Sequence, residues 1–237
     1  MTSDEAWWTV VGRPGRRRGG LDARRVISHD GAMADPGTVT SRLLWVLRHA
    51  KAVDHAPRGG TDRDRPLADR GRGDAAALGL RLATDPPALP GEALDLGPDV
   101  VNVRPSVGNG FLLERPEVAL CSAAVRTRQT AELVLAPRQG AVHLDSYRSL
   151  YDAETSTVLT YLREIDQEAG SALLVGHNPT MAELVYDLQV EGAPGRRLIE
   201  TKGFPTCALA VLRLEIDAWG DVVPGCGTLV GLYRPPY

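Results

Sequence analysis

Hydrophobic residues fall into short runs along this chain, and three of these runs end abruptly at polar residues. The three runs occupy residues 43–47, 118–121 and 172–176. Short uninterrupted apolar runs, without the alternation of a half-exposed strand, are typical of strands buried on both faces of a parallel sheet. We therefore expect these segments to form the centre of such a sheet.

Helical patterns separate and follow the runs. Helices are expected at 73–82, 126–133, 154–165 and 181–188. Ser122 is the expected N-cap of the second helix and Asn178 that of the fourth, with Pro179 at its first helical position. Two further strand-like runs lie at 207–216 and 228–232.

Strands alternating with helices predict an α/β fold, a three-layer α/β/α sandwich around a mostly parallel central sheet. Two segments depart from the pattern. Residues 1–40 hold six arginines among Gly, Asp and Ser, and we expect a disordered basic N-terminal extension, with an arm that docks on an acidic partner as the alternative. Residues 85–115 are rich in Pro and Gly and are expected to form a long surface insertion within a folded domain of residues 41–237.

Charge and cysteine content argue against several classes of function. A net charge of −3 gives no overall attraction to nucleic acid or to an anionic membrane, so neither partner is expected. The three cysteines have no CxxC spacing and the five histidines no metal-ligand spacing, so neither a disulfide framework nor a metal site is expected. No apolar run nears the roughly 18 residues of a membrane span, and the N-terminus lacks a signal-peptide pattern. These absences predict a cytoplasmic protein; nothing in the sequence indicates an oligomeric state.

Arginine and histidine follow the three central runs. Arg48 and His49 end the first, Arg126 lies in the opening turn of the helix after the second, and His177 ends the third. The ligand crevice of an open α/β sheet lies at the carboxyl ends of its strands, so these four residues are expected to converge there. The guanidinium groups of Arg48 and Arg126 have N–H donors spaced to bond two phosphoryl oxygens at once, and both groups stay charged near neutral pH.

The two histidines are expected to have different roles in phosphoryl transfer. A neutral His49, with its pKa lowered by neighbours such as Arg48, can attack phosphorus with a free ring nitrogen. A protonated His177 beside a bound phosphate dianion would stabilise charge on the equatorial oxygens. Each residue alone also has a structural explanation, Arg126 as an exposed partner of Glu132 and His177 as a hydrogen-bonded turn residue. Their order and placement together favour a phosphoryl-transfer site.

Several motifs resemble those of the histidine phosphatase superfamily, which also contains the phosphoglycerate mutases. The segments similar to its first Arg-His signature, its second arginine motif and its second histidine motif are LRHAK (47–51), SAAVRTRQTAE (122–132) and VGHNP (175–179). Further segments resemble the SixA-type branch, whose namesake removes phosphate from phosphohistidine: RPL (65–67) with Asp69 and Gly71, YDA (151–153) and FPT (204–206). The resemblance covers about residues 43–215.

This resemblance implies a phosphoglycerate mutase-like fold and a covalent phosphohistidine mechanism without a cofactor. Carried over by motif, His49 is the nucleophile, Arg48 and Arg126 bind phosphate, and His177 completes the site. The chain departs from the family at Ala50, where many members have glycine.

The general acid of the larger family members has no firm match. Its candidates here are Asp152 and Glu154, although exposed surface positions are the usual place for such carboxylates. A missing acid suits an easy leaving group such as the imidazole of phosphohistidine. A phosphoprotein or an activated phosphate is therefore favoured among the expected substrates, which are a phosphorylated protein or a small phosphate ester. A catalytically weak phosphate- or phosphoprotein-binding regulator on the same fold is the alternative, and a mutase is less favoured.

Overall fold

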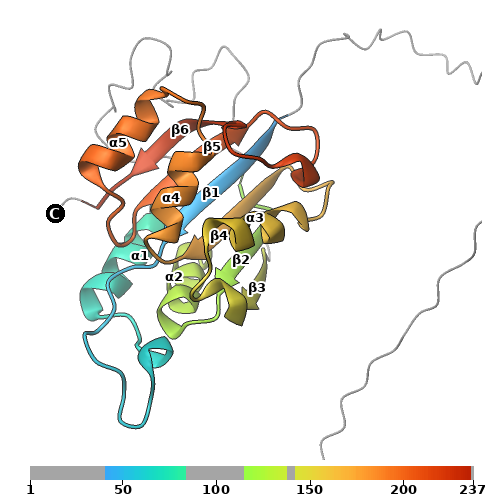
Figure 1. Ribbon diagram of the computed structural model, residues 1–237. Coiled ribbons are helices and arrows are strands. Elements are labelled where there is room, and N and C mark those ends of the chain that lie inside the picture. The colour runs from blue at the N-terminus through green and yellow to red at the C-terminus, as the bar shows by residue number, and fades with distance from the viewer. Residues whose placement is uncertain (1–40, 84–114, 138–141, 236–237) are drawn as a thin grey trace, which may run out of the picture. The chain divides into compact units, whose positions relative to one another are not determined.

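A six-stranded sheet in the order β3-β2-β4-β1-β5-β6 forms the centre of the structure (Figure 1). The computed structural model describes residues 41–83, 115–137 and 142–235. Its strands are β1 (Arg42–Arg48), β2 (Val118–Ser122), β3 (His143–Tyr147), β4 (Ser171–Gly176), β5 (Leu209–Leu214) and β6 (Gly227–Tyr233). Strands β1 to β4 run parallel, β5 is antiparallel to β1, and β6 is antiparallel to β5. The expectation of a mostly parallel sheet is confirmed.

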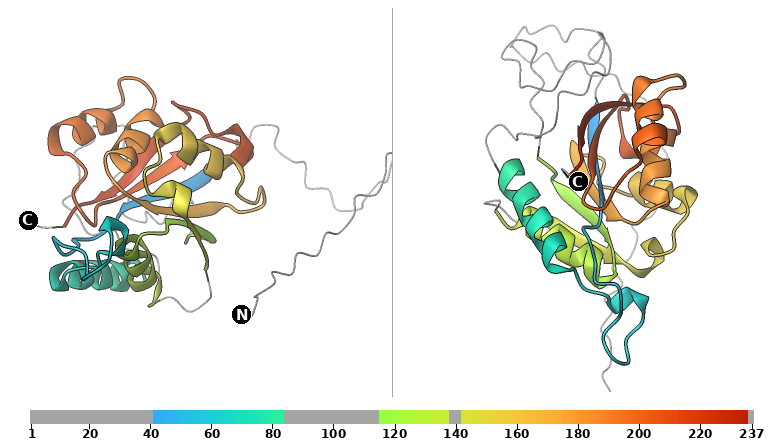
Figure 2. Two further views of the ribbon diagram at one scale, coloured as in Figure 1. Left: turned by 60° about the horizontal axis from the view of Figure 1, so that its bottom comes forward. Right: turned by 90° about the vertical axis from the view of Figure 1, so that its left-hand side faces the viewer.

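Helices cover both faces of this sheet (Figure 2). On one face lie α1 (Asp69–Leu82) and α2 (Val125–Leu135), and on the other α3 (Thr155–Arg163), α4 (Thr180–Asp187) and α5 (Pro194–Lys202). Short 3-10 helices are η1 (Asp62–Asp64), η2 (Arg148–Leu150) and η3 (Trp219–Asp221). The three-layer sandwich is confirmed.

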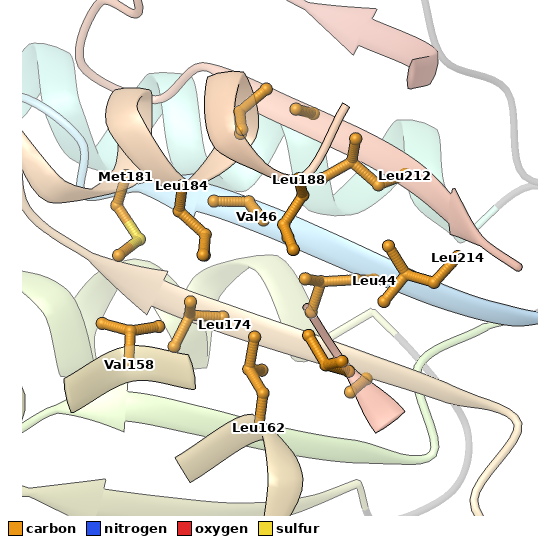
Figure 3. Packing of buried hydrophobic residues seen from close by; sticks show 14 of the residues in the cluster. Leu44, Val46, Val158, Leu162, Leu174, Met181, Leu184, Leu188, Leu212 and Leu214 are labelled. Atoms are coloured by element: carbon orange, nitrogen blue, oxygen red, sulfur yellow. The ribbon is translucent and has the colours of Figure 1, made fainter. Parts of the chain in front are cut away.

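Strand β1 shows why its apolar run is continuous. Leu44 and Val46 point into a core under α3, α4 and α5, where they pack with residues such as Leu184 (Figure 3). Trp45 and Leu47 point the other way, into a core under α1 and α2. All four side chains are fully buried, so alternate positions meet a different core rather than water.

One strand and one α-helix of the described residues were not predicted. Strand β3 is at the edge of the sheet and carries exposed and half-buried residues, so it has no apolar run. Helix α5 begins with Pro194-Gly195 and buries only Gly195 and Ile199, which hides its period. Helix α1 also begins at Asp69, four residues before the expected start. The expected extension at 1–40 and nearly all of the insertion at 85–115 lie outside the described residues, so the domain boundaries stay a prediction.

Both expected helix caps are wrong. Ser122 is the last residue of β2, and the N-cap position of α2 is Ala124. Pro179 occupies the N-cap position of α4, after a cis Asn178–Pro179 bond, and the Asn178 side chain donates instead to the carbonyl of Phe204. The hydroxyl of Ser122 also bonds elsewhere, so both polar side chains serve the site described next rather than a helix end.

Candidate active site

The two histidines lie side by side because their strands are neighbours in the sheet. Strands β1 and β4 pair in parallel with Arg48 opposite Gly176, and the His49 amide donates to the Gly176 carbonyl oxygen at 3.0 Å. The imidazole rings of His49 and His177 consequently have centroids 5.1 Å apart, with their planes tilted by 58°. Parallel pairing of β1 and β4 therefore sets the distance between the two rings.

One hydrogen bond fixes the tautomer of His49. Its Nδ1 lies 2.8 Å from the carbonyl oxygen of Ala50. A carbonyl oxygen can only accept, so Nδ1 carries the hydrogen and donates it. In the neutral ring the lone pair is then on Nε2, and that nitrogen is free to act as a nucleophile.

The main chain around His49 is held from two sides. The Thr130 hydroxyl on α2 accepts from the Ala50 amide at 3.0 Å and donates to the Arg126 carbonyl at 2.7 Å, joining the nucleophile loop to the helix. On the other side the Cys207 amide lies 3.1 Å from the His49 carbonyl oxygen. The peptide between His49 and Ala50 is thereby held on both sides, directly before the carbonyl that orients the ring.

Arg48 leaves β1 together with His49. Its Nη1 donates to the Phe204 carbonyl oxygen at 2.8 Å, and the Asn178 amide donates to the same oxygen at 2.9 Å. Three segments far apart in sequence meet at this oxygen. The positive charge of Arg48 lies close enough to lower the pKa of both His49 and His177.

Arg126 is buried, with 7% of its surface exposed. Its Nη1 donates to the main-chain oxygen of Asp62 at 2.7 Å and its Nη2 to the Asp62 carboxylate at 2.9 Å. The alternative of an exposed arginine paired with Glu132 is therefore wrong. Figure 1 shows η1, which carries Asp62, at the end of the molecule where the loop between β1 and α1 lies.

Asp62 is a site residue that the sequence analysis missed. Besides Arg126, its carboxylate accepts from Arg65 Nη1 at 2.6 Å and from the hydroxyl of Tyr151. The only sequence signal was the alternation of acidic and basic residues before the RPL segment, which is typical of a solvated turn. Tyr151 lies in a matched motif, but its contact with a residue 89 positions away is visible only in the fold.

His177 is held from the end of β2. Its Nε2 lies 2.8 Å from Ser122 Oγ, and its Nδ1 is buried without a hydrogen-bond partner in the part of the chain that the structure describes. The rings of Tyr151 and His177 pack in a T-shaped arrangement with centroids 5.3 Å apart. The structure therefore brings together the four residues expected from the sequence, with Asp62, Tyr151 and Ser122 in addition.

Burial and neighbouring cations keep both rings neutral. Burial, followed by the charges of Arg126 and Arg48, lowers the pKa of His49 to about 4, although the Ala50 hydrogen bond opposes this shift. Burial, followed by His49 and Arg126, lowers the pKa of His177 to about 3. The expected neutral His49 agrees with these directions. A protonated His177 requires the negative charge of a bound phosphate and stays a prediction.

Acid should destabilise this fold through the two histidines. Their folded-state pKa values lie below 6.5, so near pH 6 the unfolded chain binds protons that the folded chain does not. The free energy of unfolding should therefore fall as pH drops from about 6.5 towards about 4, by up to about 1.4 kcal/mol per pH unit for each histidine. Denaturant titrations at about pH 7 and about pH 5 should show a smaller fall for His177→Asn than for the wild type.

The control for this comparison is His55→Asn, a substitution at an exposed histidine of the β1–α1 loop. That variant should lose as much stability as the wild type between the two pH values. An equal loss in all three proteins would contradict the lowered pKa values.

Both candidate acids are exposed side chains. Asp152 is 79% exposed and faces Arg63, with 3.8 Å between Oδ2 and Nη2. Glu154 is exposed at the N-cap position of α3. Among the described residues neither carboxylate contacts His49, His177 or the arginines of the site. Asp62 is the carboxylate that does, and hydrogen bonds from Tyr151 and Arg65 hold its pKa well below the usual range.

Two searches of the described residues gave negative results. The described residues contain no group of three or more His, Cys, Asp or Glu side chains arranged to hold a metal ion. In the same ranges no helix is long and apolar enough to cross a membrane.

Relatives in sequence come from mycobacteria. Two uncharacterised proteins from two strains of Mycobacterium tuberculosis are each 32% identical over 195 residues, which cover 80% of this chain and 99% of the relative. An uncharacterised protein of Mycobacterium leprae is 30% identical over 195 residues, which again cover 80% of this chain and 99% of the relative. No family model matches the chain.

Solved structures supply the family. A protein of Agrobacterium tumefaciens described as the phosphohistidine phosphatase SixA matches with a TM-score of 0.58 and 28% identity, over 82% of this chain and 98% of that protein. A protein of Nakamurella multipartitia described in the same way has a TM-score of 0.61 and 24% identity. The match covers 85% of this chain and 99% of that protein, and it adds support for the fold. With its phosphoglycerate mutase-like fold and these SixA-type neighbours, the chain belongs to the histidine phosphatase superfamily.

Proposed function

We propose that this protein is a phosphatase that forms a covalent phosphohistidine on His49. The observation that carries the proposal is the state of the His49 ring. Its Nδ1–H is held by the Ala50 carbonyl, no described residue bonds to its Nε2 lone pair, and its pKa of about 4 keeps it neutral at neutral pH. A neutral imidazole so oriented is a competent nucleophile towards phosphorus.

The surrounding groups supply the rest of the reaction. The Nε2 lone pair forms a bond to phosphorus while the bond to the leaving group breaks. Arg48 and Arg126 donate hydrogen bonds to the phosphoryl oxygens and neutralise their charge, and His177 donates to an equatorial oxygen. Water then attacks phosphorus, the N–P electron pair returns to Nε2, and phosphate leaves. Since protein side chains supply this charge neutralisation, we expect turnover without added metal or cofactor.

A phosphohistidine protein is the proposed substrate. Asp62 is ionised by its hydrogen bonds, and Asp152 and Glu154 are exposed and bond to neither histidine, so no carboxylic acid among the described residues is held in place to protonate an alkoxide. An imidazole leaves with less help than an alkoxide. The SixA-type neighbour at 28% identity supports the same class of substrate.

The same absence of an acid favours one alternative, a phosphate- or phosphoprotein-binding regulator without turnover. Both proteins would bind phosphate through Arg48 and Arg126. Only the phosphatase would retain a covalent phosphoryl label after denaturation, so trapping with a labelled substrate separates the two.

The test is an assay of the purified chain on a phosphohistidine protein and on a panel of small phosphate esters that includes p-nitrophenyl phosphate. We expect fastest release from the phosphohistidine protein, inhibition by vanadate, and no effect of EDTA. Equal, slow release from all substrates would contradict the proposed substrate class. No release and no covalent label from any of them would contradict the phosphatase itself.

A further inference from the structure

A carboxylate is fixed at the exposed end of the arginine and histidine cluster. Asp62 begins η1, and this turn is held by Thr61, whose amide and hydroxyl donate to Asp64 Oδ2 at 2.7 and 2.8 Å. Arg65, which donates to Asp62 Oδ1, is itself anchored through Nε to the Val53 carbonyl oxygen at 2.8 Å. The position of Asp62 is thus set by its own loop.

One acceptor position of this carboxylate is left over. An ionised carboxylate has about four lone-pair positions. Among the described residues, Arg65 occupies one on Oδ1, and Arg126 and Tyr151 occupy two on Oδ2. The Asp62 side chain is 49% exposed, whereas that of Arg126 is 8% exposed. The remaining acceptor position is therefore on Oδ1, the oxygen that Arg65 holds, in a side chain that is half exposed.

We propose that this free position receives the leaving group, so that Asp62 accepts a hydrogen bond from the ring N–H of the departing imidazole. The inference rests on the proposed phosphatase function and adds to it the residue that recognises the leaving group. A phosphoryl dianion is stabilised among the buried cations around Arg126. The remainder of a protein substrate must extend towards solvent, and the half-exposed side chain of Asp62 lies between solvent and the buried Arg126 to which it bonds.

This contact makes an acid unnecessary. A phosphorylated imidazole with a proton on its second nitrogen carries a positive ring. When His49 Nε2 bonds to phosphorus, the P–N bond of the substrate breaks and its electron pair goes to the leaving nitrogen. The ring departs as neutral imidazole, its N–H stays in place against Asp62, and no proton moves. His49 keeps its own N–H on the Ala50 carbonyl in the same manner.

The charge of Asp62 also selects among leaving groups. Its hydrogen bonds with Tyr151 and Arg65 hold its pKa well below the usual carboxyl range, so it accepts rather than donates a proton. A fixed negative charge here attracts a cationic ring and repels an anionic leaving group such as a carboxylated alcohol.

The experiment compares the kcat/KM values of two small substrates, phosphoimidazole and p-nitrophenyl phosphate, in three full-length proteins. Nitrophenolate leaves without a proton and has no N–H to donate. In Asp62→Asn the ratio of the two values, phosphoimidazole over p-nitrophenyl phosphate, should fall about tenfold or more relative to the wild type. The matched control is Asp64→Asn on the same turn. The Asp64 carboxylate bonds to Thr61 and not to Arg126, so the Asp64→Asn variant should keep the wild-type ratio of kcat/KM values.

A role of Asp62 in holding Arg126 alone would lower both rates in proportion and leave the ratio unchanged, which would overturn the inference. A wild type that releases phosphate from neither substrate would overturn the proposed function instead. A measurement on the wild type needs no folded variant: at a pH high enough for both compounds to be free bases, imidazole should inhibit p-nitrophenyl phosphate turnover more strongly than 1-methylimidazole, whose free base lacks an N–H. Equal inhibition by the two compounds would also overturn the inference.

Discussion

Replacing His49 by alanine is expected to abolish the covalent phosphoenzyme and to lower turnover by about 10⁴-fold or more. The reason is that the two rings leave different nitrogens without a partner among the described residues. In His49 the Nδ1–H is bound to the Ala50 carbonyl and Nε2 is left, whereas in His177 the Nε2 bonds to Ser122 and the nitrogen that is left is a buried Nδ1. The measurement is a rapid acid quench with a labelled phosphate donor, followed by identification of the labelled residue.

His177→Asn is the matched control, because it removes the second ring of the pair. We expect this variant to turn over more slowly but still to place the label on His49. Label on His177 in the His49→Ala protein, or a His49→Ala protein that folds and turns over at the wild-type rate, would contradict the assignment of the nucleophile. Thermal unfolding of both variants verifies that each one is folded.

The polar residues at strand ends could be predicted because a strand buried on both faces has a continuous run of apolar residues in the sequence. The apolar run before Arg48 and His49 is long enough to mark a strand buried on both faces, and its abrupt end marks the carboxyl edge. The same holds for β4 and His177. Once these strands are parallel neighbours, the side chains that follow them meet.

Contacts made by exposed turns could not be predicted in this way. Asp62 lies in a polar turn whose pattern is that of a solvated loop, and its contact with Tyr151 arises where the two residues meet beside Arg126. Ser122 and Asn178 have the composition of helix caps, yet their side chains bond to His177 and Phe204. In each case a tertiary contact outweighed the local preference.

Gly71→Ala is expected to destabilise the fold by about 3 kcal/mol or more and to impair the site. A Cβ at Gly71 would lie 2.1 Å from the carbonyl oxygen of Lys51 and 2.9 Å from its nitrogen. This backbone cannot yield cheaply, because the Lys51 carbonyl accepts from the Ala68 amide at 2.9 Å and Lys51 is two residues from His49. The first turn of α1 therefore has to approach the nucleophile loop at a distance that only glycine allows.

The matched control for this close approach is Gly73→Ala, two residues further along the same helix. A Cβ at Gly73 meets no atom within 4 Å, so alanine there should stabilise the protein by about 0.5–1 kcal/mol through helix propensity. Denaturant unfolding should thus move in opposite directions for the two substitutions. Similar small changes in both would show that Lys51 and the loop after His49 can shift freely. In that case the rigid support inferred for His49, through Ala50 and Thr130, would be wrong as well.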